Sequence, residues 1–418
     1  MKENSLKYLP GLDGIRALAA FLVISTHWPN NMLSLKFGWI GVNIFFVLSG
    51  FLITRILLNS KQKGFRDYIT WFYYNRALRI FPLYYAFLIV SFLLVLAFTY
   101  CLPDLLNYSD WKTAYYAITH DLPYYLTYTY NLKINLRPLL HLPDSSNRYF
   151  AHLWSLALEE QFYLIFPFLV YFASIKTLKI TTIVILILCP LMRLCGVVYG
   201  TTMVSDHYWL GELFYSNTFC QADALFTGAA LAIFNIKSIK PYLTFFCAAL
   251  AWLSLGLICF IFLRKAGYFL VPFKSFGYDF PGFWFDERTN HWFINIRPFY
   301  QYTLVNLLAA SLILPAINGK PIFPVLFQNR GIAYLGKISY GIYIFHNPIM
   351  AVFILVADVN LGGWYRLTQN PFAEIACFLL YIAVVISIAH LSFRYFEKSF
   401  LKYKKRIKNT YQPIPLSA

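Results

Sequence analysis

Long apolar segments recur along most of the chain and alternate with shorter polar segments. Each of these segments is long enough to cross a hydrocarbon core of about 30 Å as a helix. The predicted spans are 12–29, 39–58, 80–100, 153–173, 181–200, 219–236, 242–263, 299–318, 334–356 and 372–393. The pattern predicts an all-α membrane protein, a bundle of about ten transmembrane helices.

Lysine and arginine residues concentrate in every second connection between these segments. If the N-terminus lies inside, the inner connections and the tail carry Lys61, Lys63, Arg66, Arg76, Arg79, Lys176, Lys179, Lys237, Lys240, Lys320, Arg330, Lys398, Lys402, Lys404, Lys405, Arg406 and Lys408. The short outer loops carry only Lys36 and Arg366. Two long outer loops, predicted near 101–152 and 264–298, carry several cations, but long loops follow the charge rule only weakly. Because cytoplasmic loops are enriched in cations, both termini are predicted to be cytoplasmic. We divide the chain into a transmembrane domain, 1–400, and a basic cytoplasmic tail, 401–418.

The composition excludes a set of soluble domains. The 418 residues are 59% hydrophobic and only 13% charged, whereas soluble domains carry about 25% charged residues. The net charge of the chain is +17. The basic residues that produce it lie between apolar segments, so membrane topology explains them better than nucleic-acid binding does. The seven cysteines have no CxxC spacing and mostly lie in apolar segments, which predicts neither a disulfide framework nor a metal site.

The first apolar segment contains two ionisable residues, Arg16 and His27. They are eleven positions apart, so on one helix they share a face and lie about 16 Å apart along the axis. Ionisable residues within a membrane are costly, and function is the default hypothesis for them. The alternative is a histidine hydrogen-bonded between helices. We expect the other helices to assemble around this face.

Further ionisable residues are predicted at a similar depth in the outer half of the membrane. Glu159 in the fourth span lies about 9 Å from its outer end, close to the level estimated for His27. Asp223 and His346 fall near the same layer, where a structural network and a functional site are equally good interpretations. Glu160 points about 100° away from Glu159, so the two carboxylates cannot share one role.

Two further features involve arginine. Arg76 and Arg79, three residues apart at the predicted inner end of the third span, share a helix face. Paired guanidinium groups suit phosphate oxygens, although positive-inside charge alone also explains them. Arg193 in the fifth span is interpreted as the structural partner of a carboxylate.

From about residue 8 to about residue 400, the sequence resembles the acyltransferase-3 family of integral membrane acyltransferases. The matching stretches, whose order and spacing together are specific, are 8–17 (YLPGLDGIRA), the Arg-x10-His spacing, 38–54, 72–85, 153–167, 223–232 and 335–349. The resemblance implies an enzyme that moves an acyl group, commonly acetyl, from cytosolic acyl-CoA, such as acetyl-CoA, to a carbohydrate or glycoside hydroxyl. The envelope acceptor would be lipopolysaccharide O-antigen, exopolysaccharide or a similar glycan, and the protein a multi-pass component of the bacterial inner (plasma) membrane.

The resemblance also assigns roles. Arg16 and His27 match the family's essential pair, Arg76 and Arg79 match the RxxR motif proposed to hold donor phosphates, and Glu159 matches the carboxylate of the SLxxE stretch. We therefore expect His27, Arg16 and Glu159 to be catalytic. No bound cofactor and no metal are expected; the acyl-CoA is a substrate.

Some features stay open. Glu160, Asp223 and His346 remain possible site residues. The family often has Arg two residues before the aspartate matched by Asp223, but here Gln221 stands there, so the resemblance does not support a cation contact at that point. The sequence separates neither general-base from acyl-histidine chemistry nor one glycan from another.

Two rival classes remain. A secondary transporter would also place ionisable residues in the membrane, but it often shows inverted repeats, and none is evident in the sequence. A non-catalytic envelope-assembly protein would be expected to lose one of the residues that match the family's catalytic positions.

Overall fold

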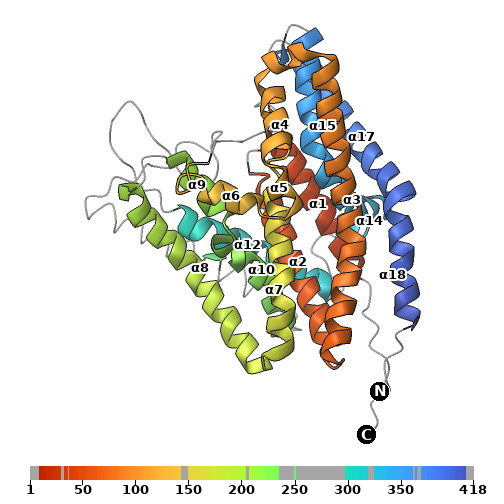
Figure 1. The fold of residues 1–418 in the computed structure, drawn as a ribbon. Helices are drawn as coiled ribbons and strands as arrows, with labels where there is room; N and C mark the ends of the chain where they lie inside the picture. Colours follow the sequence, from red (N-terminus) through yellow and green to blue (C-terminus); the bar gives the residue numbers. More distant parts are fainter. Residues whose placement is uncertain are drawn as a thin grey trace. The chain divides into compact units, whose positions relative to one another are not determined.

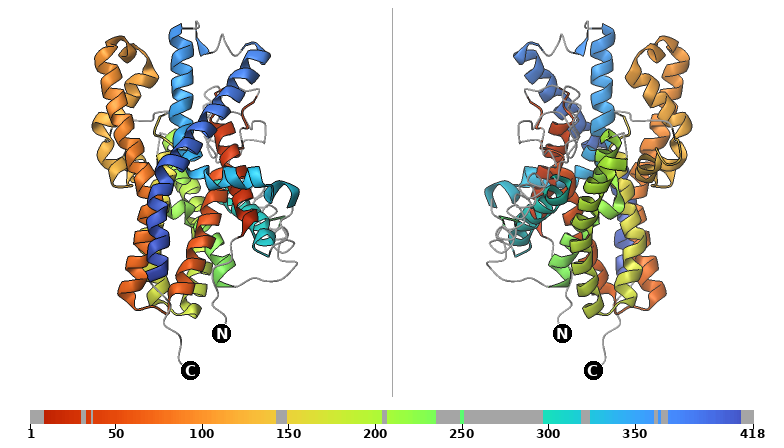
Figure 2. Two further views of the ribbon diagram at one scale, coloured as in Figure 1. Left: turned by 90° about the vertical axis from the view of Figure 1, so that its right-hand side faces the viewer. Right: turned by 90° about the vertical axis from the view of Figure 1, so that its left-hand side faces the viewer.

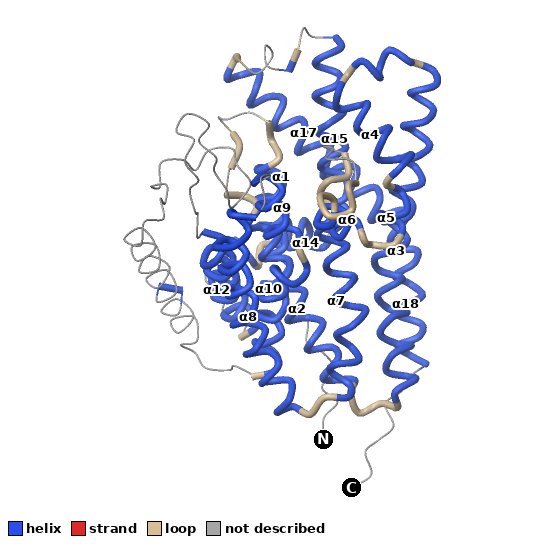
Figure 3. Tube along the Cα trace, turned by 60° about the vertical axis from the view of Figure 1, so that its left-hand side comes forward, coloured by secondary structure: helices blue, strands red, loops and turns tan. Residues whose placement is uncertain are grey.

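The computed structural model describes residues 9–29, 33–35, 37–142, 149–203, 207–234, 249–250, 297–318, 324–360, 363–364 and 369–410. Across these ranges the regular elements are helices (Figure 3). Within the described residues, seven helices are long and apolar enough to cross a membrane. The prediction of an all-α membrane protein is thus confirmed. The number of about ten spans and the cytoplasmic termini stay predictions, and of the predicted span 242–263 only residues 249–250 are described.

The chain divides into two compact units. Unit 1 comprises the described residues of Met1–Asn59, Thr127–Asp144 and Leu153–Lys337, and unit 2 those of Ser60–Leu126, Ser145–His152 and Ile338–Ala418. The helices of unit 1 are α1 (Pro10–Thr26), α2 (Ile40–Ser60), α6 (Tyr130–Leu136), α7 (Leu153–Phe172), α8 (Ile175–Met203), α9 (His207–Ser216), α10 (Thr218–Ile233), α12 (Arg297–Ile317), α13 (Pro324–Phe327) and α14 (Arg330–Lys337). Those of unit 2 are α3 (Phe65–Cys101), η1 (Pro103–Asn107), α4 (Ser109–His120), α5 (Leu122–Leu126), α15 (Ser339–Asn360), α17 (Pro371–Leu391), η2 (Ser392–Glu397) and α18 (Lys398–Thr410) (Figure 1).

Helix α1 packs against α12, α13 and α14 in unit 1. Its backbone approaches its neighbours so closely that only glycine fits at the contacts. A Cβ atom on Gly14 would lie 2.4 Å from the carbonyl oxygen of Phe327, and one on Gly336 would lie 1.7 Å from that of Asp13. These distances are far inside van der Waals contact, so any side chain would force the helices apart. Helix α1 is thus in direct backbone contact with its neighbours in unit 1, while the assembly of the other helices around the face of Arg16 and His27 stays a prediction.

The start of α2 and its middle are held in the same way. A Cβ on Gly38, just before α2, would lie 2.0 Å from the carbonyl oxygen of Leu22 on α1. A Cβ on Gly50 would lie 1.9 Å from that of Leu225 on α10. Helix α2 is therefore locked between α1 and α10 by backbone contacts.

Unit 2 is organised by two very long helical segments. Helix α3 has 37 residues, and α17, η2 and α18 follow one another as a second, bent helix (Figure 2). Helix η2 is a π-helix, a wider helix that occurs mostly as short insertions and is frequent at functional sites. Both η2 and α18 pack against α3, and α18 runs beside it in Figures 1 and 3.

The boundaries differ from the predicted spans in two places. Helix α3 begins at Phe65, whereas the predicted span begins near residue 80. The first turns of the helix are amphipathic and too polar to be recognised as part of an apolar span. The segment 101–152, predicted as a long outer loop, contains η1 and three short helices, α4 to α6. Of these helices, α4 and α5 belong to unit 2 and α6 belongs to unit 1.

Large apolar side chains are exposed along the outer faces of several long helices. On α8 they are Ile180, Ile183, Val184, Ile187, Leu188 and Leu191, and α3 and α17 carry similar rows. Such surfaces would associate in water, but they are compatible with lipid chains. The protein is a multi-pass integral membrane protein.

Candidate functional site

The first candidate group lies on α1. Arg16 Nη1 donates a hydrogen bond of 2.9 Å to Asp13 Oδ1, and both carboxylate and guanidinium are largely buried, with 6% and 19% of the side chains exposed. The i,i+3 spacing places the two side chains on neighbouring turns. Sequence reasoning singled out Arg16 and overlooked Asp13, although the spacing Asp-x-x-Arg was a visible signal of the pair.

His27 directly follows the last residue of α1, Thr26, and has helical backbone angles. One continuous helix therefore carries Arg16 and leads to His27, as the sequence predicts. The Nδ1 atom of His27 is 2.8 Å from the carbonyl oxygen of Val23. A carbonyl oxygen can only accept, so Nδ1 carries the hydrogen and the basic lone pair of a neutral ring lies on Nε2.

The His27 side chain is exposed. An imidazole that is fixed in one tautomer and accessible can accept a proton from an incoming group. The geometry of this residue thus suits a general base.

Glu159 and Glu160 lie in the first half of α7, and both side chains are half-buried. The next residue, Gln161, donates from Nε2 to the backbone oxygen of Tyr128 at 2.9 Å and to Asn131 Oδ1 at 2.8 Å. Tyr128 has φ of 54°, a left-handed conformation that is costly for a side chain of this size. Gln161 therefore holds a strained turn beside the carboxylates. The pairing of Glu159 with His27 stays a prediction.

Asp223, a possible site residue, is part of a fully buried ion pair. Arg193 Nη1 and Nη2 donate to its two carboxylate oxygens at 3.1 and 2.7 Å, and both side chains are 0% exposed. Thr303 Oγ1 donates to the same carboxylate at 2.9 Å, and Arg193 also donates to the backbone oxygen of Cys220. These bonds join α8, α10 and α12. Arg193 is the structural partner of a carboxylate, as the sequence indicated.

Gln221 stands where the family often has an arginine, so that position supplies no cation to Asp223. Arg193 provides the cation from α8 instead. Gln221 belongs to a different cluster, in which Asn43 Nδ2 donates to Gln221 Oε1 at 3.2 Å and to Asn306 Oδ1 at 2.9 Å. All three amides are buried. They link α2, α10 and α12, and sequence reasoning missed Asn43 and Asn306 because single amides in apolar segments give no spacing signal.

Arg76 and Arg79 both lie within α3, in unit 2, where the spacing of three puts them on one face. Arg79 is exposed and Arg76 is half-buried. Lys63, in the turn before α3, lies over the Trp71 ring at 4.6 Å. Partial burial lowers the pKa of Lys63, and the charge of Asp67 acts in the opposite direction. The beginning of α3 thus presents several cations.

His346, the last predicted candidate, is fully buried on α15 in unit 2. Its ring lies 5.0 Å from that of His152, centroid to centroid, in an edge-on arrangement. Tyr381 donates to the backbone oxygen of His346 at 3.2 Å, and Tyr343 donates to that of His152 at 3.1 Å. His346 is therefore embedded in a hydrogen-bonded and aromatic network, which favours a structural role.

Comparison with known proteins gives a consistent result. The model of a family described as an acyltransferase domain matches residues 9–392. The chain is 28% identical to the peptidoglycan O-acetyltransferase OatA of Listeria monocytogenes serovar 1/2a, over 97% of this chain and 58% of the relative. It is 27% identical to the putative peptidoglycan O-acetyltransferase YrhL of Bacillus subtilis strain 168, over 95% of this chain and 55% of the relative.

A putative O-acetyltransferase of Staphylococcus aureus strain COL is 27% identical over 96% of this chain and 58% of the relative. The chain thus spans less than two thirds of the length of these relatives. No solved structure matches the chain.

Proposed function

Since the chain belongs to the acyltransferase family and is a membrane acyltransferase, we propose that it transfers an acetyl group from cytosolic acyl-CoA to a hydroxyl of a cell-envelope carbohydrate. The proposed location is the bacterial inner (plasma) membrane. The observation that carries the proposal is the fixed tautomer of His27 at the end of α1, with the Asp13–Arg16 ion pair on the same helix.

His27 acts as the general base in this proposal. Its Nε2 removes the proton of the acceptor hydroxyl as the oxygen attacks the thioester carbonyl. The new C–O ester bond forms, the C–S bond breaks, and the proton on Nε2 passes to the departing thiolate. The Val23 carbonyl orients the ring, which leaves Glu159 to stabilise the imidazolium electrostatically. Attack by His27 itself, giving an acyl-histidine, is the competing route.

Arg16 and the α3 arginines act on the donor. The exposed Arg79 and the half-buried Arg76 are suited to bind the phosphates of the coenzyme, since planar guanidinium groups pair with phosphate oxygens. Asp13 holds the Arg16 guanidinium in place, so that it can guide the pantetheine thioester along α1.

The acceptor class follows from the relatives. Two of them are named for peptidoglycan, which favours a cell-wall glycan over O-antigen or exopolysaccharide as the acceptor. The long outer segment between α3 and α7 contains many tyrosines, such as Tyr115, Tyr124 and Tyr128, and aromatic rings can stack on sugars.

The decisive experiment measures transfer of radiolabelled acetyl groups by the purified protein in proteoliposomes. His27→Ala is expected to abolish transfer while the protein still inserts and remains folded. His120→Ala, which removes an exposed histidine from α4, is the matched control and should retain normal activity. Near-normal transfer by His27→Ala would overturn the proposed role of His27.

The same vesicles test the transporter alternative. A transporter would exchange labelled substrate across the membrane in counterflow without forming an ester. Ester formation without counterflow is the result expected for the enzyme.

A further inference from the structure

Helices α1 and α2 of unit 1 pack in an antiparallel arrangement, and two glycine contacts define how they are aligned. A Cβ on Gly38 would lie 2.0 Å from the Leu22 carbonyl oxygen. One on Gly41 would lie 2.4 Å from the Ala19 carbonyl oxygen. Three residues forward along α2 therefore correspond to three residues backward along α1, and this alignment can be extended to the rest of both helices.

Two arginines lie on the faces by which these helices meet. Arg16 is three residues before Ala19 and thus on the same face of α1. Arg55 is fourteen residues, or just under four turns, after Gly41 and thus on the α1-facing side of α2. In the antiparallel alignment, Arg55 lies about 15 Å from Arg16 along the interface, because the two are about ten residues apart at 1.5 Å each.

The charge of Arg55 lacks the compensation that Arg16 has. Asp13 pairs with Arg16, whereas no carboxylate forms an ion pair with Arg55 within the described ranges of the chain. The Arg55 side chain is half-buried. A topology anchor that extends to lipid headgroups is the alternative role for such a residue. Its place on the side of α2 that packs against α1 favours a role within the protein.

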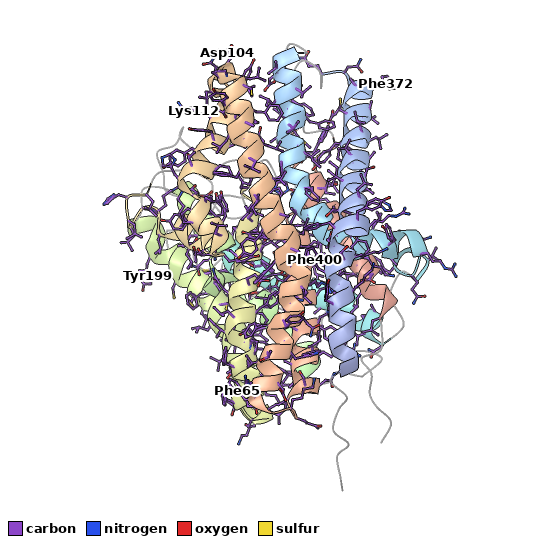
Figure 4. The ribbon with its side chains drawn as sticks, turned by 45° about the vertical axis from the view of Figure 1, so that its right-hand side comes forward. Phe65, Asp104, Lys112, Tyr199, Phe372 and Phe400 are labelled. Atoms are coloured by element: carbon purple, nitrogen blue, oxygen red, sulfur yellow. The ribbon has the colours of Figure 1, made fainter. Side chains whose placement is uncertain are left out.

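Arg55 lies near the end of α2 that is predicted to be the inner one. Helix α2 ends at Ser60, and the short connection to Phe65 is one of those that the lysine and arginine pattern assigns to the inner side. In Figure 4, Phe65 and Asp104 mark opposite ends of α3, and this connection lies at the Phe65 end. A donor that enters from that side would meet Arg55 before it reaches the interface with α1.

We propose that Arg55 binds the diphosphate group of the acyl-CoA donor, at the inner end of the interface between α1 and α2. This inference rests on the proposed function and assigns to unit 1 a phosphate-binding residue that is separate from the arginines of α3. A guanidinium group suits this ligand, because its planar fork pairs with two phosphate oxygens at once.

The spacing of the three residues matches the parts of the donor. Arg16 lies about 15 Å from Arg55, and His27 lies about 16 Å beyond Arg16. An extended phosphopantetheine arm spans roughly 17 Å from phosphorus to sulfur. Together with contact distances and the reach of one arginine and one histidine side chain, the arm bridges the total of roughly 30 Å. A diphosphate at Arg55 would therefore place the arm beside Arg16 and the thioester within reach of His27.

The test compares coenzyme A with pantetheine, which has the same arm without phosphates. Binding of radiolabelled coenzyme A to the full-length protein in detergent, and its displacement by pantetheine, give both dissociation constants. Arg55→Gln is expected to raise the constant for coenzyme A about tenfold, the effect of one lost charge-assisted contact. The constant for pantetheine should stay within about twofold of the wild-type value. An unchanged constant for coenzyme A, or an equal rise for both compounds, would overturn the proposal.

Lys176→Gln is the matched control, because Lys176 is an exposed cation in the first turn of α8, in another predicted inner connection. It should bind coenzyme A like the wild type, and an equal weakening by both variants would assign the effect of Arg55 to general positive charge. If Arg55→Gln does not fold, Arg55→Lys retains the cation for membrane orientation but loses the planar fork. It should weaken coenzyme A binding about threefold, and unchanged binding would overturn the proposal equally.

The same measurements separate two kinds of failure. If the wild type binds coenzyme A and Arg55→Gln binds it equally well, only the role of Arg55 is lost. If the wild type itself does not bind coenzyme A, the proposed donor is wrong, and the inference falls with it.

Discussion

Arg193 and Asp223 form a bidentate ion pair in which neither side chain is exposed to solvent. The pair joins α8 to α10, and Thr303 extends it to α12. A buried charge that loses its partner is very costly, whereas replacement of both partners by apolar residues can be neutral.

We therefore expect Asp223→Leu to destabilise the protein by about 3–5 kcal/mol, because it leaves the Arg193 charge without its counter-ion. The double variant Arg193→Met with Asp223→Leu should recover most of this loss. Thermal unfolding in detergent, followed by intrinsic fluorescence, measures both effects. If the double variant were as unstable as the single one, the account of the pair as a charge-compensated link would be incorrect.

A second prediction concerns the contact between α1 and α14. Gly336→Ala would bring a methyl group to 1.7 Å from the Asp13 carbonyl oxygen, so the helices must separate and the fold should lose several kcal/mol or fail to form. Gly64→Ala is the matched control, since a Cβ there meets nothing within 4 Å, and its stability should stay within about 1 kcal/mol of the wild type. The yield of monodisperse protein and its unfolding temperature distinguish the two. Equal behaviour would contradict the close approach.

A third prediction addresses the Asp13–Arg16 pair. Asp13→Asn retains a hydrogen-bond acceptor but removes the charge that fixes Arg16, so we expect acetyl transfer to fall about tenfold, or roughly 1.4 kcal/mol in the barrier, with the protein still folded. Arg16→Lys retains the cation but loses the planar fork and should lose at least as much activity. Transfer rates at saturating donor provide the measurement. Full activity in Asp13→Asn would show that Arg16 needs no positioning by this carboxylate.

A fourth prediction concerns the α3 arginines. The double variant Arg76→Ala with Arg79→Ala should raise the donor concentration needed for half-maximal transfer by tenfold or more, because each lost charge-assisted contact is worth about 1.5–3 kcal/mol. Raising the salt concentration should weaken donor use by the wild type more than by the double variant, since screening acts on exposed charges. An identical dependence on acyl-CoA in both proteins would argue against phosphate binding at this place.

The sequence predicted the helical class and the helix that carries Arg16 and His27, because apolar length and the positions of single charges are properties of local segments. The predicted third span begins near residue 80, fifteen residues after α3 begins at Phe65, since the first turns of that helix are too polar to count as part of an apolar span. Hydropathy responds to lipid contact rather than to helix formation, so helical turns outside the apolar stretch escape it.

Pairings between distant residues were less accessible. The sequence indicated that Arg193 has a carboxylate partner but did not identify Asp223, thirty positions away, because that contact depends on how α8 and α10 pack. The same limit concealed the link between Asn43 and Asn306. Tertiary packing alone determines these relationships.

The glycine contacts around α1 have a mechanical consequence. At Gly14, Gly336 and Gly38 the backbones of neighbouring helices are in direct contact, without flexible side chains between them. Helix contacts of this kind allow little sliding or rotation of one helix against the other. We therefore expect α1, which leads to His27, to keep its position against α13, α14 and the beginning of α2 during turnover, so that motions that admit or release a substrate would arise in other helices.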